Sequence, residues 1–442
     1  MNFELVLQDA TLATFTRKGY TTEVANVGIR NGKIEAVSSS PLSADKVLSL
    51  KNLTVLPGVI DSQVHFREPG MTQKEDLETG TRSAALGGVT SVFEMPNTVP
   101  ATTTFDLLAE KFRRAEGRSW VNHAFFVGGS PDNIDHLAEL ETFPGCPGIK
   151  VFMGSSTGTL LVEDDSTLEK IFRAGRRRVI LHSEDEFRLR ERKHIAVDNK
   201  DVKLHHVWRD AESAISSTRR LLNLARKTSR PVHVLHVTTA DEMEILATYK
   251  DIASVEVLPQ HLTLSAPECY ERLGTLAQQN PPIREKHHQE ALWKALQNGV
   301  VDVMGSDHAP HTLEEKSREY PNTPSGMPGV QTLVPVMLQH VHDGKLSLRR
   351  FIELVCENPR WVFGCKTKGR IEVGMDADFT VVDLNRQETI QNSWIASRVG
   401  WTPFDGMKVT GWPVMTIVGG QIVMQDAQLI GNPIGKPVPF FS

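Results

Sequence analysis

Residues 54–66 read TVLPGVIDSQVHF, a nearly continuous apolar run that ends in the polar group Gln63-Val64-His65. Seven similar runs follow along the chain, at residues 88–96, 122–127, 148–152, 177–183, 231–237, 253–259 and 299–307. Runs rich in Val, Ile and Leu are typical of parallel strands that are buried on both faces. Helical spacing of apolar residues separates the eight runs, which predicts an α/β fold, a TIM-type (β/α)₈ barrel rather than a doubly wound sheet.

The two ends of the chain have a different pattern, with strand-like alternation and tight turns. Asn31-Gly32 is a strong hairpin signal near the N-terminus, and Gly419-Gly420 marks another turn near the C-terminus. We therefore expect a small β-sandwich domain built from both termini. The expected boundaries are 1–53 and 367–442 for the two parts of the sandwich and 54–366 for the barrel.

Composition narrows the class of protein. The 442 residues are 40% hydrophobic and 23% charged, with a formal net charge of -5. This balance offers no basic surface for nucleic acid and no polybasic membrane anchor, and no apolar stretch reaches the roughly 20 residues that span a bilayer. The N-terminus lacks the basic region of a signal peptide, and Cys146, Cys269, Cys356 and Cys365 are scattered like reduced thiols. We expect a cytoplasmic protein that acts on a small molecule.

Polar residues end or interrupt five of the eight runs, where the chemistry of a TIM barrel is located. They are His65, Lys150, His182, His236 and Asp307. A lone histidine at a strand end is more often a satisfied polar residue, but three histidines and an aspartate at one end of a barrel match the ligands of a catalytic zinc site. A lysine ammonium cannot bind a metal. Lys150 is therefore either a rim lysine or a lysine that CO₂ has converted to an anionic carbamate.

Several motifs resemble those of one family. VIDSQVHFREPG (59–70), GIKVFMGSSTG (148–158) and SDHAPH (306–311) occur in this order and resemble the signature of dihydroorotases within the amidohydrolase superfamily. The resemblance covers essentially the whole chain. It implies a pair of zinc ions bound by His65, N6-carboxylated Lys150, His182, His236 and Asp307, with the lysine carbamate as a bridge between them.

The same resemblance implies a reaction and a substrate site. The reaction is the reversible hydrolysis of the cyclic amide of (S)-dihydroorotate to N-carbamoyl-L-aspartate in pyrimidine biosynthesis. Asp307 would carry the proton from the attacking water to the ring nitrogen. Arg67, Asn97 and His311 would hold the substrate carboxylate, Asn280 would contact the pyrimidine ring, and residues 323–331 would supply backbone contacts.

One departure from the family pattern concerns the metal site. The family opens its site with H-x-H, and Gln63 stands in place of the first histidine. An amide oxygen is a weaker zinc ligand than imidazole, so the number of bound metals stays open. A catalytically weak, dihydroorotase-like scaffold is a competing interpretation for the same reason.

The substrate class depends on the role of Arg67. An allantoinase or a hydantoinase of the dihydropyrimidinase type would open uncharged rings, for which Arg67 would have no anion to bind. The competing interpretation of Arg67 is an ion pair with Glu68 or another acid at the rim. We expect a homodimer, with association with aspartate transcarbamoylase as a further possibility. The pairs His205-His206 and His287-His288 lie in polar helical stretches, where we expect them to be exposed.

Overall fold

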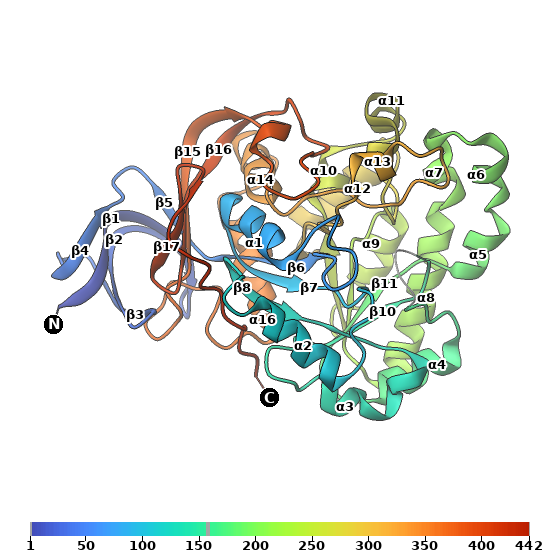
Figure 1. The fold of residues 1–442 in the computed structure, drawn as a ribbon, viewed down its shortest axis with the longest axis horizontal. Coiled ribbons are helices and arrows are strands. Elements are labelled where there is room, and N and C mark those ends of the chain that lie inside the picture. The colour runs from blue at the N-terminus through green and yellow to red at the C-terminus, as the bar shows by residue number, and fades with distance from the viewer. Residues whose placement is uncertain (1, 156–159, 442) are drawn as a thin grey trace.

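The structure is a computed structural model that describes residues 2–155 and 160–441. Part of the motif GIKVFMGSSTG, residues 156–158, lies outside the described residues. Two regions are visible (Figure 1): strands from both ends of the chain lie side by side at the left, and a barrel surrounded by helices occupies the right.

The barrel region contains every strand run expected from the sequence. A six-stranded sheet has the order β14-β13-β12-β11-β10-β9, a three-stranded sheet has the order β6-β7-β8, and all their pairings are parallel. The bounds are β6 Val59–Val64, β7 Val89–Glu94, β8 Asn122–Phe125, β9 Val127–Gly128, β10 Ile149–Phe152, β11 Val179–His182, β12 Val232–Val234, β13 Ala253–Val257 and β14 Val303–Met304. The prediction of parallel barrel strands is confirmed.

The two sheets meet at two places. Only Phe126 separates β8 from β9, so these two segments form one strand position. On the other side, a parallel bridge joins Val64 to His308, and the His65 N–H donates to the His308 carbonyl at 2.7 Å. The first strand of the barrel thus lies beside the segment that follows the last.

Residues 54–66 form two strands, where the sequence suggested one. β5 (Thr54–Pro57) pairs with β1 and β15 in the sheet of the termini, whereas β6 begins at Val59 in the barrel. Gly58 separates them because a Cβ there would lie 2.2 Å from Thr90 Oγ1. The expected domain boundaries, 1–53, 54–366 and 367–442, remain predictions.

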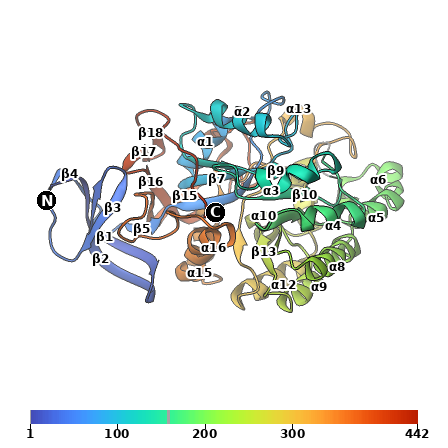
Figure 2. The same ribbon diagram turned by 90° about the horizontal axis from the view of Figure 1, so that it is seen from below.

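Helices fill the connections between barrel strands, and many begin at an expected capping residue. Asp76 accepts the Thr79 N–H at 2.8 Å at the start of α1, and Asp210 accepts the Ser213 N–H at 3.1 Å at the start of α8. The helices of the first half are α1 Leu77–Leu86, α2 Phe105–Ala115, α3 Leu137–Leu140, α4 Asp165–Arg173, α5 Glu186–Glu191, α6 His194–Asn199, α7 His205–Trp208 and α8 Ala211–Thr228. Those of the second half are α9 Ala240–Ala247, α10 Pro259–Thr263, α11 Glu268–Leu273, α12 Lys286–Gln297, α13 Leu313–Lys316, α14 Leu333–His342, α15 Leu348–Ile352 and α16 Asn358–Phe363. Viewed from below, α4, α8, α9 and α12 cover one side of the barrel (Figure 2).

Strands from both termini form a single nine-stranded sheet. Its order is β18-β17-β16-β15-β5-β1-β2-β3, and β4 pairs with β1 off this path. The bounds are β1 Phe3–Thr16, β2 Gly19–Arg30, β3 Lys33–Ser38, β4 Ala44–Ser49, β15 Phe379–Thr389, β16 Lys408–Val418, β17 Gln421–Gln425 and β18 Gln428–Leu429. Both predicted hairpins are confirmed: Asn31-Gly32 joins β2 to β3 and Gly419-Gly420 joins β16 to β17, with positive φ at all four residues.

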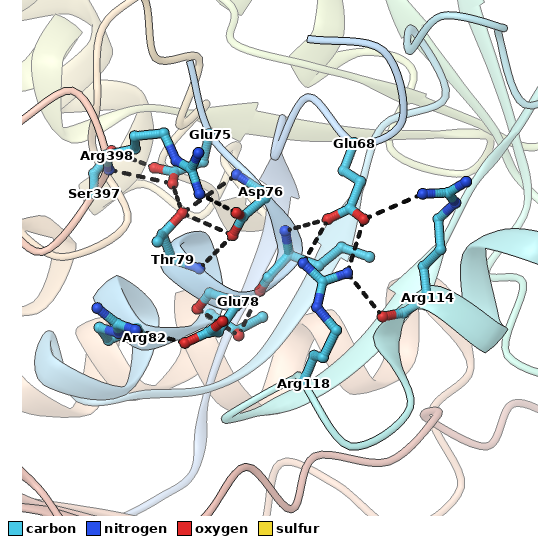
Figure 3. A network of polar contacts seen from close by, with 12 residues as sticks. Glu68, Glu75, Asp76, Glu78, Thr79, Arg82, Arg114, Arg118, Ser397 and Arg398 are labelled. Carbon is cyan, nitrogen blue, oxygen red and sulfur yellow. Dashed lines mark hydrogen bonds and ion pairs between the residues drawn. The ribbon is translucent and has the colours of Figure 1, made fainter. Parts of the chain in front are cut away.

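The C-terminal part also reaches the loops at the carboxyl ends of the barrel strands. The buried Trp401 donates from Nε1 to the His311 carbonyl at 2.8 Å, Ser397 donates to Glu75, and Arg398 pairs with Asp76. The last two contacts appear in Figure 3. Within the described residues, no helix combines the length and apolar character needed to cross a bilayer.

A buried ion pair fixes the loop that follows β6. Lys111 on α2 lies 2.7 Å from Glu94 at the end of β7, and both side chains are almost fully buried. The other Glu94 oxygen accepts the Phe66 N–H at 3.1 Å. The pair therefore anchors the backbone between His65 and Arg67.

We predict that Lys111→Met lowers the free energy of unfolding by about 3–5 kcal/mol, because it leaves the Glu94 carboxylate buried without a counter-charge. Urea titration followed by circular dichroism measures this. The control is Arg113→Met, which breaks an exposed pair with Glu110 and should change stability by no more than about 0.5 kcal/mol. Equal effects of the two substitutions would contradict the prediction.

Candidate active site at the strand ends

Three of the sequence-predicted site residues have a backbone that favours glycine. Arg67, His236 and Asp307 have φ values of 65°, 36° and 43°. A non-glycine residue held in this region costs on the order of 1–3 kcal/mol, and such strain concentrates at functional sites. The structure thus shows local strain at strand ends where the sequence predicts chemistry.

Asp307 lies at the centre of one group of side chains. Its Oδ1 accepts a hydrogen bond from Gln63 Nε2 at 3.1 Å and lies 3.1 Å from His65 Nε2. The other ring nitrogen of His65 lies 2.8 Å from Asn97 Oδ1. Burial would raise the pKa of Asp307, but the hydrogen bond and charge of His65 outweigh it, so the pKa is lowered and the carboxylate is anionic.

His182 and His236 form a second group on neighbouring strand ends. His182 Nδ1 lies 3.1 Å from His236 Nε2, and His182 Nε2 donates to Glu184 at 2.8 Å. Burial lowers the pKa of both imidazoles, so both are neutral at pH 7. Arg209 in turn donates from Nε to Glu184 at 3.0 Å, which holds that carboxylate in place.

Lys150 lies between these groups, only 1% exposed. It makes no ion pair with any described residue, and its Nζ lies 4.4 Å from the centre of the Phe152 ring. Burial lowers the pKa of Lys150 to about 7. A neutral amine is therefore accessible near physiological pH, which is the form that reacts with CO₂.

Arg67 and His311 form a third group beside Asp307. Arg67 is 2% exposed, donates from Nε to the Pro310 carbonyl at 3.3 Å and lies with Nη2 3.2 Å from His311 Nε2. Burial and the charge of Arg67 lower the pKa of His311 to about 3, so its ring is neutral. Lys74 lies 3.2 Å from the other ring nitrogen and 2.9 Å from Glu315.

The competing interpretation of Arg67, an ion pair with Glu68, is wrong. Glu68 is bound instead by Arg118 at 2.8 Å, by Arg114 at 3.5 Å and by the Leu77 N–H at 3.0 Å (Figure 3). Arg67 has no carboxylate partner at ion-pair distance among the described residues.

Asn280 lies against a histidine that the sequence suggested was exposed. His205 is fully buried and lies with Nε2 3.0 Å from Asn280 Oδ1; His288 is also buried, at 6% exposure. The expectation of exposure is wrong for these two, because tertiary packing buries one face of otherwise polar helices. Burial lowers the pKa of His205 to about 3.

Two residues of this region were missed by the sequence analysis. Glu184 follows His182 by two positions, the strand spacing that puts side chains on one face, so its role was detectable. Lys74 carried no such signal, because its loop has no regular period.

The predicted metal-binding side chains lie near one another, but they do not form a complete set of zinc ligands. No three His, Cys, Asp or Glu residues among those described form a preassembled metal-binding group. The candidate ligand atoms form two pairs: His65 Nε2 lies 3.1 Å from Asp307 Oδ1, and His182 Nδ1 lies 3.1 Å from His236 Nε2. Two ligands of one tetrahedral zinc, each about 2.0–2.1 Å from the metal, lie about 3.3–3.4 Å apart. His236 Nδ1 and Gln63 Oε1 are buried without a hydrogen-bond partner in the described part of the chain. Neutral imidazoles and a carboxylate suit a metal.

Comparison with known proteins identifies the family. The model of the amidohydrolase family matches residues 54–423. The chain belongs to the amidohydrolase family. Among the relatives of this amidohydrolase, a dihydroorotase from Methanothermobacter thermautotrophicus is 34% identical over 424 residues, 94% of each chain. A dihydroorotase from Pyrococcus abyssi is 34% identical over 418 residues, 93% of this chain and 94% of its own.

A solved structure supports the same assignment. The L-hydantoinase (dihydropyrimidinase) from Arthrobacter aurescens aligns with a TM-score of 0.93 at 30% identity, over 99% of this chain and 100% of its own. Together with the strand order, this shows the TIM-type barrel with its β-sandwich domain. The predicted fold class and family are confirmed.

We predict that Glu184→Gln weakens zinc binding about 10–100-fold, because a carboxylate that orients a metal-binding histidine contributes that much to affinity. Competition with a chromophoric chelator measures the dissociation constant. Glu186→Gln is the matched control: Glu186 is also buried but accepts the Ser155 N–H instead of touching His182. Unchanged affinity in Glu184→Gln would contradict the orienting role.

Proposed function

We propose that this amidohydrolase is a dihydroorotase, which interconverts (S)-dihydroorotate and N-carbamoyl-L-aspartate. One observation carries the proposal: Arg67 is a buried guanidinium without a carboxylate partner among the described residues, next to His311. Dihydroorotate carries a ring carboxylate, and a guanidinium binds a carboxylate through two parallel hydrogen bonds. The relatives named dihydroorotase support the same substrate.

We propose that His65, Lys150, His182, His236 and Asp307 hold the metal, with Lys150 N6-carboxylated. The neutral amine of Lys150 would bond to CO₂ and lose a proton, and the resulting anionic carbamate would be an oxygen ligand. When bound, zinc lowers the pKa of a water molecule to about 7 and polarises the carbonyl that is attacked.

The protein side chains would then orient the ring and move one proton. Arg67, His311 and Asn97 would hold the carboxylate, and Asn280 would contact the ring. The water oxygen bonds to the ring carbonyl carbon while Asp307 accepts a proton from the water. As the C–N bond breaks, Asp307 gives that proton to the ring nitrogen, and the new carboxylic acid releases the second water proton to solvent to become a second carboxylate.

We predict that Arg67→Met lowers kcat/KM for dihydroorotate at least about a hundredfold, because two hydrogen bonds to a charged group contribute about 3 kcal/mol or more. Ultraviolet absorbance follows ring opening and closure, and hydantoin and dihydrouracil serve as uncharged substrates. Activity on the uncharged rings should be much less affected.

Arg118→Met is the control, since Arg118 binds Glu68 rather than the substrate pocket. No turnover of dihydroorotate or carbamoyl aspartate by the zinc-loaded protein would overturn the proposed function. A preference for uncharged rings that survives Arg67→Met would favour a hydantoinase, in line with the structural relative. The homodimer, the association with aspartate transcarbamoylase and the cytoplasmic location stay predictions.

A further inference from the structure

Gln63 takes part in the candidate metal site in a way that its sequence position alone does not reveal. It is 1% exposed, and its amide faces the same Asp307 oxygen as His65. The nitrogen of the amide, Nε2, is the donor to Asp307 at 3.1 Å, while Oε1 is buried with no hydrogen-bond partner among the described residues. The side chain thus presents a donor, not a ligand atom, to the carboxylate.

The two sides of the candidate metal site differ in the ligands that the chain supplies. A catalytic zinc site needs about three protein ligands and one open position. His182, His236 and a Lys150 carbamate meet this requirement on one side. On the other side the described chain supplies His65 and Asp307, and a third ligand only where the Lys150 carbamate shares its second oxygen, because the Gln63 amide nitrogen that faces Asp307 does not bind zinc.

Recruiting Gln63 as the missing ligand would be unfavourable. Its amide would have to turn so that Oε1 points toward the metal, which breaks the hydrogen bond from Nε2 to Asp307 in a buried site. The oxygen gained is neutral and binds zinc more weakly than imidazole.

We propose that this chain holds one tightly bound zinc, on the His182–His236–Lys150 side. On the other side, Gln63 and His65 hold the Asp307 carboxylate by hydrogen bonds where a second metal would otherwise hold it. Gln63 is therefore a positioning residue for Asp307. This inference rests on the proposed metal site but not on which ring is hydrolysed.

The experiment counts metals in the full chain. The protein is loaded with excess zinc and bicarbonate, dialysed against a weak chelator and measured by inductively coupled plasma mass spectrometry. We expect about one zinc per chain for the wild type and about two for Gln63→His, which adds an imidazole ligand on the second side that does not depend on sharing the carbamate. Loading with Mn²⁺ gives an independent readout: the electron paramagnetic resonance spectrum should show isolated ions in the wild type and a coupled pair in Gln63→His.

Gln260→His is the matched control. Gln260 is as buried as Gln63 and lies next to the same chain segment, but it donates to the Ser306 carbonyl at 2.7 Å instead of to Asp307. Its variant should keep about one zinc. If Gln63→His fails to fold, Gln63→Glu tests the same point, because an anionic oxygen should also bring in the second metal.

The outcomes separate this inference from the proposed function. Two tightly bound zinc ions in the wild type, or one in a folded Gln63→His and Gln63→Glu, would overturn the one-metal proposal. No retained zinc in any variant would overturn the metal site itself, and with it this inference. A count of one in the wild type and two in the variants supports the proposal whatever the substrate.

Discussion

A buried hydrogen-bonded seam joins the first barrel strand to the segment that follows the last. Asp61 Oδ1 accepts the backbone N–H groups of Ser306 at 2.9 Å and Gln63 at 3.2 Å, and the His65 N–H donates to the His308 carbonyl at 2.7 Å. Gln63, His65 and Asp307, whose side chains contact one another, belong to these same two segments. The interactions that bring the two strands together therefore also set the spacing of Gln63, His65 and Asp307, so the geometry of the site follows from the fold rather than from a mobile loop.

The strands of the termini serve the site indirectly. The segment before β16 lies against the loops that follow β6 and β14, where Trp401 binds the His311 carbonyl and Arg398 binds Asp76. Loops that carry binding residues are usually the least stable parts of a barrel. Here the C-terminal segment supplies backbone and charge contacts to them, through Trp401 and Arg398.

The barrel was predictable from the sequence because eight apolar runs carry a strong periodic signal, and the polar residues that end them were found for the same reason. The break between β5 and β6 at Gly58 was not predictable, since it depends on the close approach of Thr90. The burial of His205 and the contact of Lys74 with His311 also depend on loops without a regular period. The orientation of the Gln63 amide is a tertiary property too: the sequence raises the question, but only the position of Asp307 shows which end of the amide faces the carboxylate.

Buried Lys and Arg side chains differ in whether the protein itself supplies their partners. Lys111 is paired with Glu94 and Arg209 with Glu184, while Lys316 donates to three backbone carbonyls, each at 3.0 Å. These groups have hydrogen-bond or ion-pair partners within the protein and need no ligand. Arg67 and Lys150 are as buried but have no carboxylate partner in the described chain, and a buried unpaired charge is strongly unfavourable. Each requires something from outside. An anionic substrate would satisfy Arg67, and CO₂ would remove the charge of Lys150, so binding the substrate and assembling the metal site would each relieve a cost that the folded chain carries alone.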